Sequence, residues 1–474
     1  MTWAKDKKRI SLAEHFSFGK LYRFVLPTVV MMVFTSIYSI VDGIFISRFA
    51  GKTPFAAINL IYPFLMVLSS FGFMMGTGGS AIVGKTMGQG DKELANKRFS
   101  MIVCSTVVIA FILVGLGQIL VQPIAQALSN FSTSDSAEDK LTLVANATLY
   151  GRILICGLPL LLLQFVFQSF VITAERPKLG LFSTLAAGFA NMIADALFVG
   201  VFKWGLIGAA SATLLSEAFG GLFPLIYFLS KKNDSALHFR RFNFSIKIIL
   251  GVMGNGFSEL LGNIAGSIVS TIFNIQLLRL VGQDGVAAYG MIMYLQFVFM
   301  AIYFGYALGC SPIISYQFGA DNQKELQNIV KKSLITTAGM GLLMFGLSFS
   351  LSYVLPHLFF PGDQALIDLS GNGFRFTSFI FLFAGFNVYF SAVFTALGNG
   401  AISAIISFGR TMVFEVTALL VFPIFLGLTG TWLAPTIADF CAFLLDLVLF
   451  LAFERRYHYL KSGPLTAKED KELF

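Results

Sequence analysis

Long apolar segments separated by short polar stretches follow one another from about Leu21 to Phe450. Each segment exceeds the roughly 18 residues that a helix needs to cross a bilayer. Alternating patterns of about ten residues, typical of membrane β-barrels, do not occur. The pattern predicts an all-α integral membrane protein with twelve transmembrane helices, at residues 20–46, 54–82, 99–123, 147–173, 178–201, 205–229, 248–278, 286–316, 331–356, 371–397, 402–427 and 429–452.

The composition supports this fold class. Hydrophobic residues make up 56% of the 474 residues and charged residues only 12%, whereas charged residues make up about a quarter of a soluble domain. The net charge of +8 comes from 33 Lys and Arg residues that lie in short clusters between the apolar segments. We therefore attribute the positive charge to membrane topology and expect no nucleic-acid partner.

The distribution of these cations also predicts the orientation of the chain. If the N-terminus is cytoplasmic, the outward loops contain only Arg48, Lys52, Lys140, Lys203 and Arg279. Most other Lys and Arg residues then lie on the cytoplasmic side, as the positive-inside rule requires. The first apolar segment is too long for a signal peptide and is expected to be retained. We expect a multi-pass protein of the prokaryotic cytoplasmic membrane with both termini in the cytoplasm.

An internal repeat relates the two halves of the chain. The segment FAGKTPFAAINLIYP at residues 49–63 aligns with LVGQDGVAAYGMIMY at 280–294, and GQGDKELAN from Gly88 aligns with GADNQKELQN from Gly319. Near the end of each half, Glu217 and Asp439 occupy equivalent positions. Repeats of this kind are common in transporters. The sequence predicts parallel six-helix bundles at residues 1–229 and 244–456, a cytoplasmic linker at 230–243 and a cytoplasmic tail at 457–474.

Residues 79–86 fit the phosphate-loop pattern GxxxxGK[ST]. That motif requires a loop between a strand and a helix, so that backbone N–H groups can bind phosphate. Here the first glycine lies inside an apolar helix and Lys85 marks its end. We therefore reject ATP hydrolysis.

Acidic residues inside the predicted helices indicate function, because a buried carboxylate is costly in a membrane. Asp42 lies near the outer end of the first helix, and Asn191 and Asp195 share one face of the fifth. Thr213 in the sixth helix lies at the same depth. These four residues could bind sodium, which prefers oxygen ligands, or the two carboxylates could exchange a proton. A polar cluster that only holds helices together is the alternative.

A second acidic position, Glu259, lies in the polar segment GNGFSELLGN of the seventh helix. It could line a cavity and pair with a cationic substrate or exchange a proton. Alternatively, Glu259 only joins helices through Asn255 or Asn263.

Other residues suggest a hinge and a substrate cavity. Pro27 removes a backbone hydrogen bond from the first helix and permits a bend. Glutamine, methionine and aromatic side chains could form an adaptable cavity for flat organic cations, although packing in the core or against lipid is the alternative for each. The cavity candidates are Gln164, Gln168, Gln276, Met293, Tyr294, Gln296, Phe297 and Met300.

Several functional classes are excluded by what the sequence lacks. The four histidines lie at helix ends or in loops, and the four cysteines are far apart without a CxxC motif. No DDxxD motif for a metal-diphosphate site occurs, and the DxxxD pattern of Asp135 and Asp139 lies in a predicted outward loop, away from the cytoplasm. We therefore expect no enzyme activity and no cofactor other than a transported sodium ion or proton. Nor does the sequence indicate an obligate protein partner.

Taken together, these features resemble the multidrug and toxic compound extrusion transporters of prokaryotes. The resemblance extends from Lys20 to about Arg456. It rests on LPTVVMMVFTSIYSIVDGIFISRFAG with Pro27 and Asp42, on the GxGDKEL-like loop in both halves, on NMIAD in the fifth helix, and on GLIGAASAT before Glu217.

The resemblance implies antiport of an organic cation against an inward cation, by two bundles that form a V. By position, Asp42, Asn191, Asp195 and Thr213 are similar to the family's cation site in the first bundle, and Glu259 to its acidic site in the second. Some members carry an Asp where this chain has Asn387, which shifts the expected ion coupling to the first bundle. We expect drugs and other small organic cations as substrates, with membrane lipids around the protein. The alternative is a flippase for lipid-linked or polyisoprenoid substrates.

Overall fold

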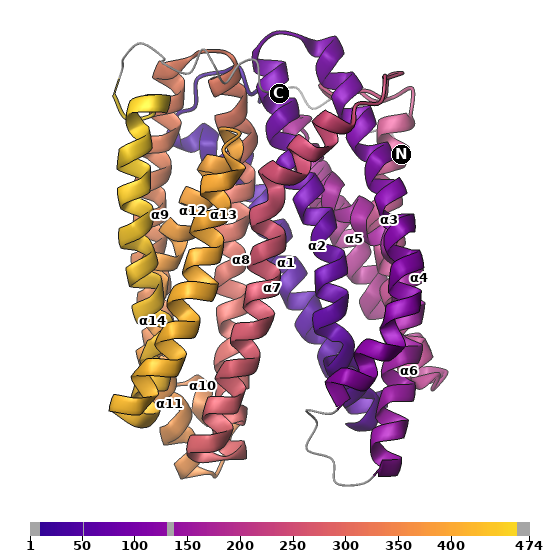
Figure 1. Cartoon of the computed structure of the whole chain (residues 1–474), viewed down its shortest axis with the longest axis vertical. Coiled ribbons are helices and arrows are strands. Elements are labelled where there is room, and N and C mark those ends of the chain that lie inside the picture. The colour runs from indigo at the N-terminus through magenta and orange to yellow at the C-terminus, as the bar shows by residue number, and fades with distance from the viewer. Residues whose placement is uncertain (1–9, 51, 130–136, 462–474) are drawn as a thin grey trace.

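The computed structural model describes residues 10–50, 52–129 and 137–461, and its described segments are helices joined by short connections (Figure 1). The N-terminal half comprises α1 (Phe18–Phe45), η1 (Ile46–Ala50), α2 (Lys52–Gly88), α3 (Lys92–Ser129), α4 (Ala137–Thr173), α5 (Pro177–Asp195), η2 (Ala196–Val201) and α6 (Gly205–Leu229). The C-terminal half comprises α7 (Ile246–Val281), α8 (Gln283–Gly319), α9 (Gln323–Leu351), α10 (Leu355–Phe359), α11 (Gln364–Ser378), α12 (Phe381–Ala396), α13 (Gly400–Phe408), η3 (Gly409–Glu415) and α14 (Val416–Tyr457).

The described helices account for the twelve predicted membrane crossings. Ten helices are long and apolar enough to cross a membrane, and the bent pair α11 and α12 adds an eleventh crossing. The stretch Gly400–Tyr457 has 58 residues, so it would be roughly 87 Å long if straight, against a hydrocarbon core of about 30 Å. Non-helical backbone at Gly427, with φ 55° and ψ −133°, divides this stretch into two crossings. The division falls where the sequence predicted the eleventh helix to end.

The tenth predicted span, at 371–397, is not one straight helix. It consists of α11 and α12, which meet at an angle of 47°. The Ser378 hydroxyl donates to the Phe374 carbonyl (2.7 Å) and also contacts the Ser348 hydroxyl. The Tyr303 hydroxyl donates to the Phe381 carbonyl at 2.8 Å. Side-chain hydroxyls thus bond to backbone carbonyls on both sides of the bend, and side chains inserted into a helix ladder are a known cause of helix kinks.

The two halves lie together where α1 begins and α14 ends, and diverge toward the opposite end (Figure 1). We call the first end the terminal face. There α1 packs against α8, and α2 packs against α7 and α8. Glycines permit close approach, because a Cβ at Gly256 would lie 2.0 Å from the Met74 carbonyl oxygen, and one at Gly319 would lie 2.1 Å from that of Lys85. We call this contact between the two halves the seam. The phosphate-loop-like residues 79–86 lie within α2 at the seam, so they form no phosphate-binding loop.

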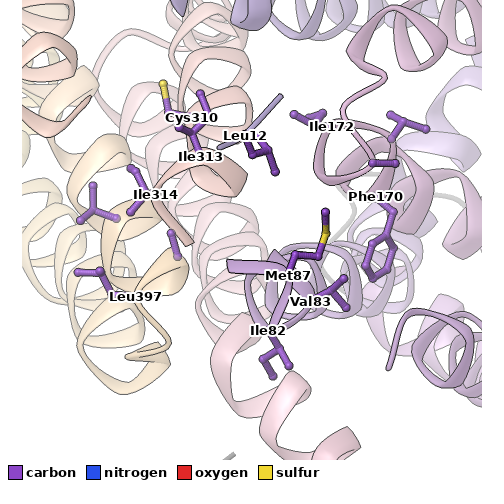
Figure 2. Packing of buried hydrophobic residues seen from close by; sticks show 14 of the residues in the cluster. Leu12, Ile82, Val83, Met87, Phe170, Ile172, Cys310, Ile313, Ile314 and Leu397 are labelled. Atoms are coloured by element: carbon purple, nitrogen blue, oxygen red, sulfur yellow. The ribbon is translucent and has the colours of Figure 1, made fainter. Parts of the chain in front are cut away.

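A buried hydrophobic cluster fills the interior near the terminal face (Figure 2). Figure 2 shows Leu12 among side chains of this cluster that include Met87 of α2, Ile172 of α4 and Ile313 of α8. Leu12 and Phe16 are both fully buried. The segment that precedes α1 is therefore part of the core.

This segment, residues 10–17, is bound by both halves, and we call it the N-terminal strap. The Glu175 carboxylate, between α4 and α5, accepts hydrogen bonds from the Ser11 hydroxyl (2.8 Å) and the Leu12 N–H (2.9 Å). The Glu325 carboxylate at the start of α9 accepts one from the Phe16 N–H (2.8 Å). Within the strap, a hydrogen bond from Lys20 of α1 holds the pKa of Glu14 below its usual value. The strap thus connects the N-terminal half to the C-terminal half.

Candidate functional site: acidic residues inside both halves

Three of the four residues predicted to form the cation site lie together. The Asp42 carboxyl of α1 contacts the Asp195 carboxyl and the Asn191 side chain of α5. Asp195 and Asn191 are buried. The fourth residue, Thr213 of α6, donates to the Ala209 carbonyl of its own helix (3.1 Å) and contacts Tyr150.

Most oxygens of this group lack donors. Asp42 Oδ1, Asn191 Oδ1 and both carboxylate oxygens of Asp195 are buried and accept no hydrogen bond from the described residues. Two adjacent carboxylates without a basic partner repel each other if both are ionised. The arrangement therefore fits a bound cation or a shared proton.

Four further polar residues, which the sequence pattern did not assign to the site, extend the group. Tyr38 and Tyr62 lie within electrostatic reach of Asp42, and Tyr150 lies within reach of both Asp42 and Glu217. Glu217 is buried and its Oε2 accepts no hydrogen bond from the described residues. The position of Tyr38, one turn before Asp42 on the same helix face, is a signal that could have identified it. Tyr62 and Tyr150 carry no such signal, because long-range packing brings them to the site.

Each of the three π-helical segments lies next to intramembrane charges. The segment η1 begins four residues after Asp42, η2 begins directly after Asp195, and η3 contains Arg410 and Glu415. A π-helical turn holds an extra residue, so it rotates the following side chains relative to those of a regular α-helix. Such segments often occur at functional sites.

The C-terminal half contains a cavity of about 230 Å³. Both residues predicted for the acidic site of this half, Glu259 and Asn387, line it, as does Arg410. Asn263 donates to the backbone carbonyl of Glu259 (2.9 Å), whereas Asn255 bonds to the Thr395 carbonyl (2.9 Å). The N-terminal half contributes Met32, Phe73 and Thr77 to the lining. The cavity therefore reaches the seam between the halves.

Asn387 and Arg410 both bind a carboxylate behind the cavity wall. The Asn387 amide donates to Asp439 Oδ1 and to the Asp439 carbonyl, each at 3.0 Å. The Arg410 guanidinium donates through Nε to Asp439 Oδ1 and through Nη2 to Asp439 Oδ2. Asp439, known from the sequence only as the repeat equivalent of Glu217, is thus the acid that Asn387 binds.

The eight residues predicted to line a substrate cavity do not line this one. Gln164 and Gln168 are buried within the N-terminal half, and Gln276 donates to the Leu419 carbonyl at 3.2 Å. Met293, Tyr294 and Phe297 are exposed on α8, and Gln296 and Met300 are partly exposed. The five positions on α8 lie in the half of that helix that is farther from the terminal face. Their contact with substrate stays a prediction.

Comparison with known proteins identifies the family. The family model for MatE matches residues 27–197 and 260–442, one stretch in each half, so the chain belongs to the MatE family. Multidrug export protein MepA of Staphylococcus saprophyticus is 23% identical over 452 residues, which cover 95% of this chain and 97% of that protein. MepA of Staphylococcus aureus strain NCTC 8325 is 22% identical over 453 residues, with the same coverage of both chains. This protein is therefore a multi-pass membrane transporter and not an enzyme.

Solved structures agree on the fold. The outward-facing conformation of a multidrug resistance MATE family transporter of the MOP superfamily superimposes with a TM-score of 0.81 at 22% identity. A crystal structure of MATE in complex with MaL6 gives 0.82, also at 22% identity. Each match covers 92% of this chain and 96% of the other. At this identity the likeness establishes the fold alone.

Proposed function

We propose that this protein is a secondary active antiporter that exports amphipathic organic cations in exchange for inward sodium or proton flow. The observation that carries the proposal is the contact between Asp42 and Asp195, whose buried oxygens largely lack donors among the described residues. The names of the MepA relatives support multidrug export as the activity.

The N-terminal half, residues 1–229, is the proposed site of ion coupling. The site consists of Asp42, Asn191 and Asp195, with Thr213 reached through Tyr150. Sodium would take oxygens from both carboxylates and the amide. A proton would remove the repulsion between the carboxylates, and the titration would belong to the pair.

Helix α1 is the proposed link between the ion site and the seam. Asp42 lies near one end of α1. Near the other end, a Cβ at Gly309 would lie 2.7 Å from Val25, and one at Gly305 would lie 2.6 Å from Val29. Pro27 lies between these two valines and lacks the N–H that would stiffen the helix. Ion binding can therefore change the contact between α1 and α8 at the seam, provided that the ion binds the closed and the open conformation of the seam with different affinity.

The C-terminal half, residues 244–456, is the proposed site of substrate binding. A carboxylate at Glu259 would pair with the cationic group of a substrate, and the aromatic and aliphatic lining of the cavity would contact its apolar part. We further propose that the protein lies in the cytoplasmic membrane of a prokaryote. The linker 230–243 and the tail 457–474 would then lie in the cytoplasm, as the distribution of Lys and Arg requires.

The test measures efflux of a fluorescent organic cation from proteoliposomes under a sodium gradient or a pH gradient, each imposed separately. Asp42→Asn and Asp195→Asn should abolish gradient-driven efflux at unchanged protein content. Asp368→Asn, an exposed carboxylate of α11, is the matched control and should transport normally. Undiminished efflux by Asp42→Asn would overturn the assigned coupling site, and the gradient that drives transport identifies the ion.

A further inference from the structure

A second charged network lies inside the C-terminal half, behind the wall of the cavity. Its centre is the pairing of Arg410 with both carboxylate oxygens of Asp439. Asp439 is 2% exposed and the Arg410 side chain is 18% exposed. Asn387 donates two further hydrogen bonds to Asp439. Asp439 is therefore a fully satisfied carboxylate, and its partner Arg410 reaches the cavity wall.

A second carboxylate of the network has no such partners. Asp446 lies two turns after Asp439 on α14 and is 0% exposed. Neither of its carboxylate oxygens accepts a hydrogen bond from the described residues. Arg410 and Asp439 are both within electrostatic reach of Asp446. A buried ionised carboxylate without a donor is among the most unfavourable groups that a protein interior can contain.

The charges around Asp446 do not balance. Arg410 interacts with three carboxylates, namely Asp439, Asp446 and Glu415 of η3. The neighbouring titratable groups, Tyr303 beside Asp439 and Tyr289 beside Glu415, are neutral phenols. One guanidinium can neutralise one carboxylate, and its hydrogen bonds go to Asp439. At least one of the other two carboxylates therefore requires a proton, and Asp446 is the one that is wholly enclosed.

We propose that Asp446 is a proton-binding site, and that its proton is released when an organic cation binds in the cavity that Arg410 lines. Proton loss lowers the charge of the Arg410–Asp439–Asp446 group by one, which favours a cation on the other side of the wall. By linkage, cation binding must then favour proton release to the same extent. The exchange of this proton for an organic cation rests on the proposed function, whereas the binding of a proton by Asp446 does not depend on it. This site is separate from Asp42 and Asp195 in the other half.

The first experiment detects the proton directly. Infrared spectra of the purified full-length protein at neutral pH contain a carbonyl band from protonated carboxyl groups, which ionised carboxylates lack. Asp446→Asn should lose the intensity of one carboxyl group, and Asp368→Asn should lose none. Asp446→Leu, which has a similar volume and no polar group, should give the same loss if the Asn variant folds poorly. A full-intensity band in both Asp446 variants would overturn the proposal.

The second experiment tests the exchange. Tetraphenylphosphonium is added to weakly buffered protein in detergent, and the released protons are counted from the pH change. For each bound tetraphenylphosphonium, Asp446→Asn should release about one proton fewer than the wild type, whereas the control Asp368→Asn should release as many protons as the wild type. Equal release by Asp446→Asn and the wild type would overturn the exchange. If the wild type binds no tetraphenylphosphonium, the proposed substrate class fails, and the infrared band still decides whether Asp446 holds a proton.

Discussion

Close contact between two glycines determines how tightly the halves meet at the seam. A Cβ at Gly78 would lie 2.2 Å from the Val252 carbonyl oxygen, and one at Gly256 would lie 2.0 Å from that of Met74. Both neighbours are backbone atoms, which cannot rotate away. We expect Gly256→Ala to disfavour this conformation by about 1–3 kcal/mol, the usual cost of overpacking.

The measurement is thermal unfolding of the purified variant, together with labelling of a cysteine placed at the seam. Gly256→Ala should lower the melting temperature or raise the labelling rate. Gly254→Ala is the control, because a Cβ there meets no atom within 4 Å, and alanine favours helix over glycine by up to about 1 kcal/mol. Identical behaviour of the two variants would show that the seam tolerates a methyl group at Gly256.

A single amide oxygen can distinguish the two possible coupling ions. Asn191 Oδ1 is buried beside Asp42 and accepts no hydrogen bond from the described residues. Asn191→Ala removes this oxygen and leaves both carboxylates. We expect the sodium concentration for half-maximal efflux to rise roughly tenfold, equivalent to about 1.4 kcal/mol of lost ligand binding. Efflux driven by a pH gradient should be unchanged, and a parallel loss under both gradients would mean that Asn191 supports the fold of the site.

At the scale of elements, the N-terminal strap depends on a few side chains of both halves. Glu325→Ala removes the acceptor of the buried Phe16 N–H and the partner of His15. A buried donor without an acceptor costs about 1–3 kcal/mol. Hydrogen exchange of residues 10–17, followed by mass spectrometry, should therefore become faster.

The repeat provides the control for this prediction. Glu93 is the sequence equivalent of Glu325, but it forms an exposed ion pair with Lys97 one turn away. Such pairs contribute about 0–1 kcal/mol. Glu93→Ala should leave exchange in the strap unchanged. Equal acceleration by both variants would mean that the exchange reflects general loosening of the terminal face.

Hydropathy predicts the helices well because burial in lipid imposes length and composition on each crossing. It predicts even the break at Gly427, since the polar residues around it separate two apolar segments. It does not predict η1, η2, η3 or the bend between α11 and α12, because a π-helical turn or a bend changes neither the length nor the composition of an apolar segment. Leu12 and Phe16 lie outside the long apolar segments, so their burial depends on the contact between the halves.

The same distinction, between what apolar segments reveal and what depends on contacts between elements, applies to the candidate sites. Asp42 and Asp195 could be identified because a carboxylate inside an apolar segment is conspicuous. The contact of Arg410 with Asp439 could not, because these residues come from different elements and are 29 positions apart in the sequence. The two halves therefore share a fold but not a charge pattern. The N-terminal pair has no basic residue bonded to it among the described residues, whereas the C-terminal network contains Arg410.

For the whole molecule, transport by alternating access requires the seam at the terminal face to open. Gly84 of α2 and Ser315 of α8 face each other there, and a Cβ at Gly84 would lie 3.4 Å from the Ser315 Cβ. This is close to the 3.5–4.5 Å that a disulfide requires. Gly84→Cys combined with Ser315→Cys should therefore form a disulfide under mild oxidation and hold the halves in the conformation of Figure 1.

We expect the oxidised double variant to lose most of its efflux and to recover it on reduction. Each single variant should be insensitive to the oxidant, which controls for the native free cysteines at 104, 156, 310 and 441. The measurement is efflux from proteoliposomes, with the extent of cross-linking determined by mass spectrometry of the same sample. Because a covalent bond cannot open within a transport cycle, unchanged efflux at complete cross-linking would mean that separation of α2 from α8 is not part of that cycle. If alternating access operates at this seam, efflux should fall in proportion to the fraction of protein that is cross-linked.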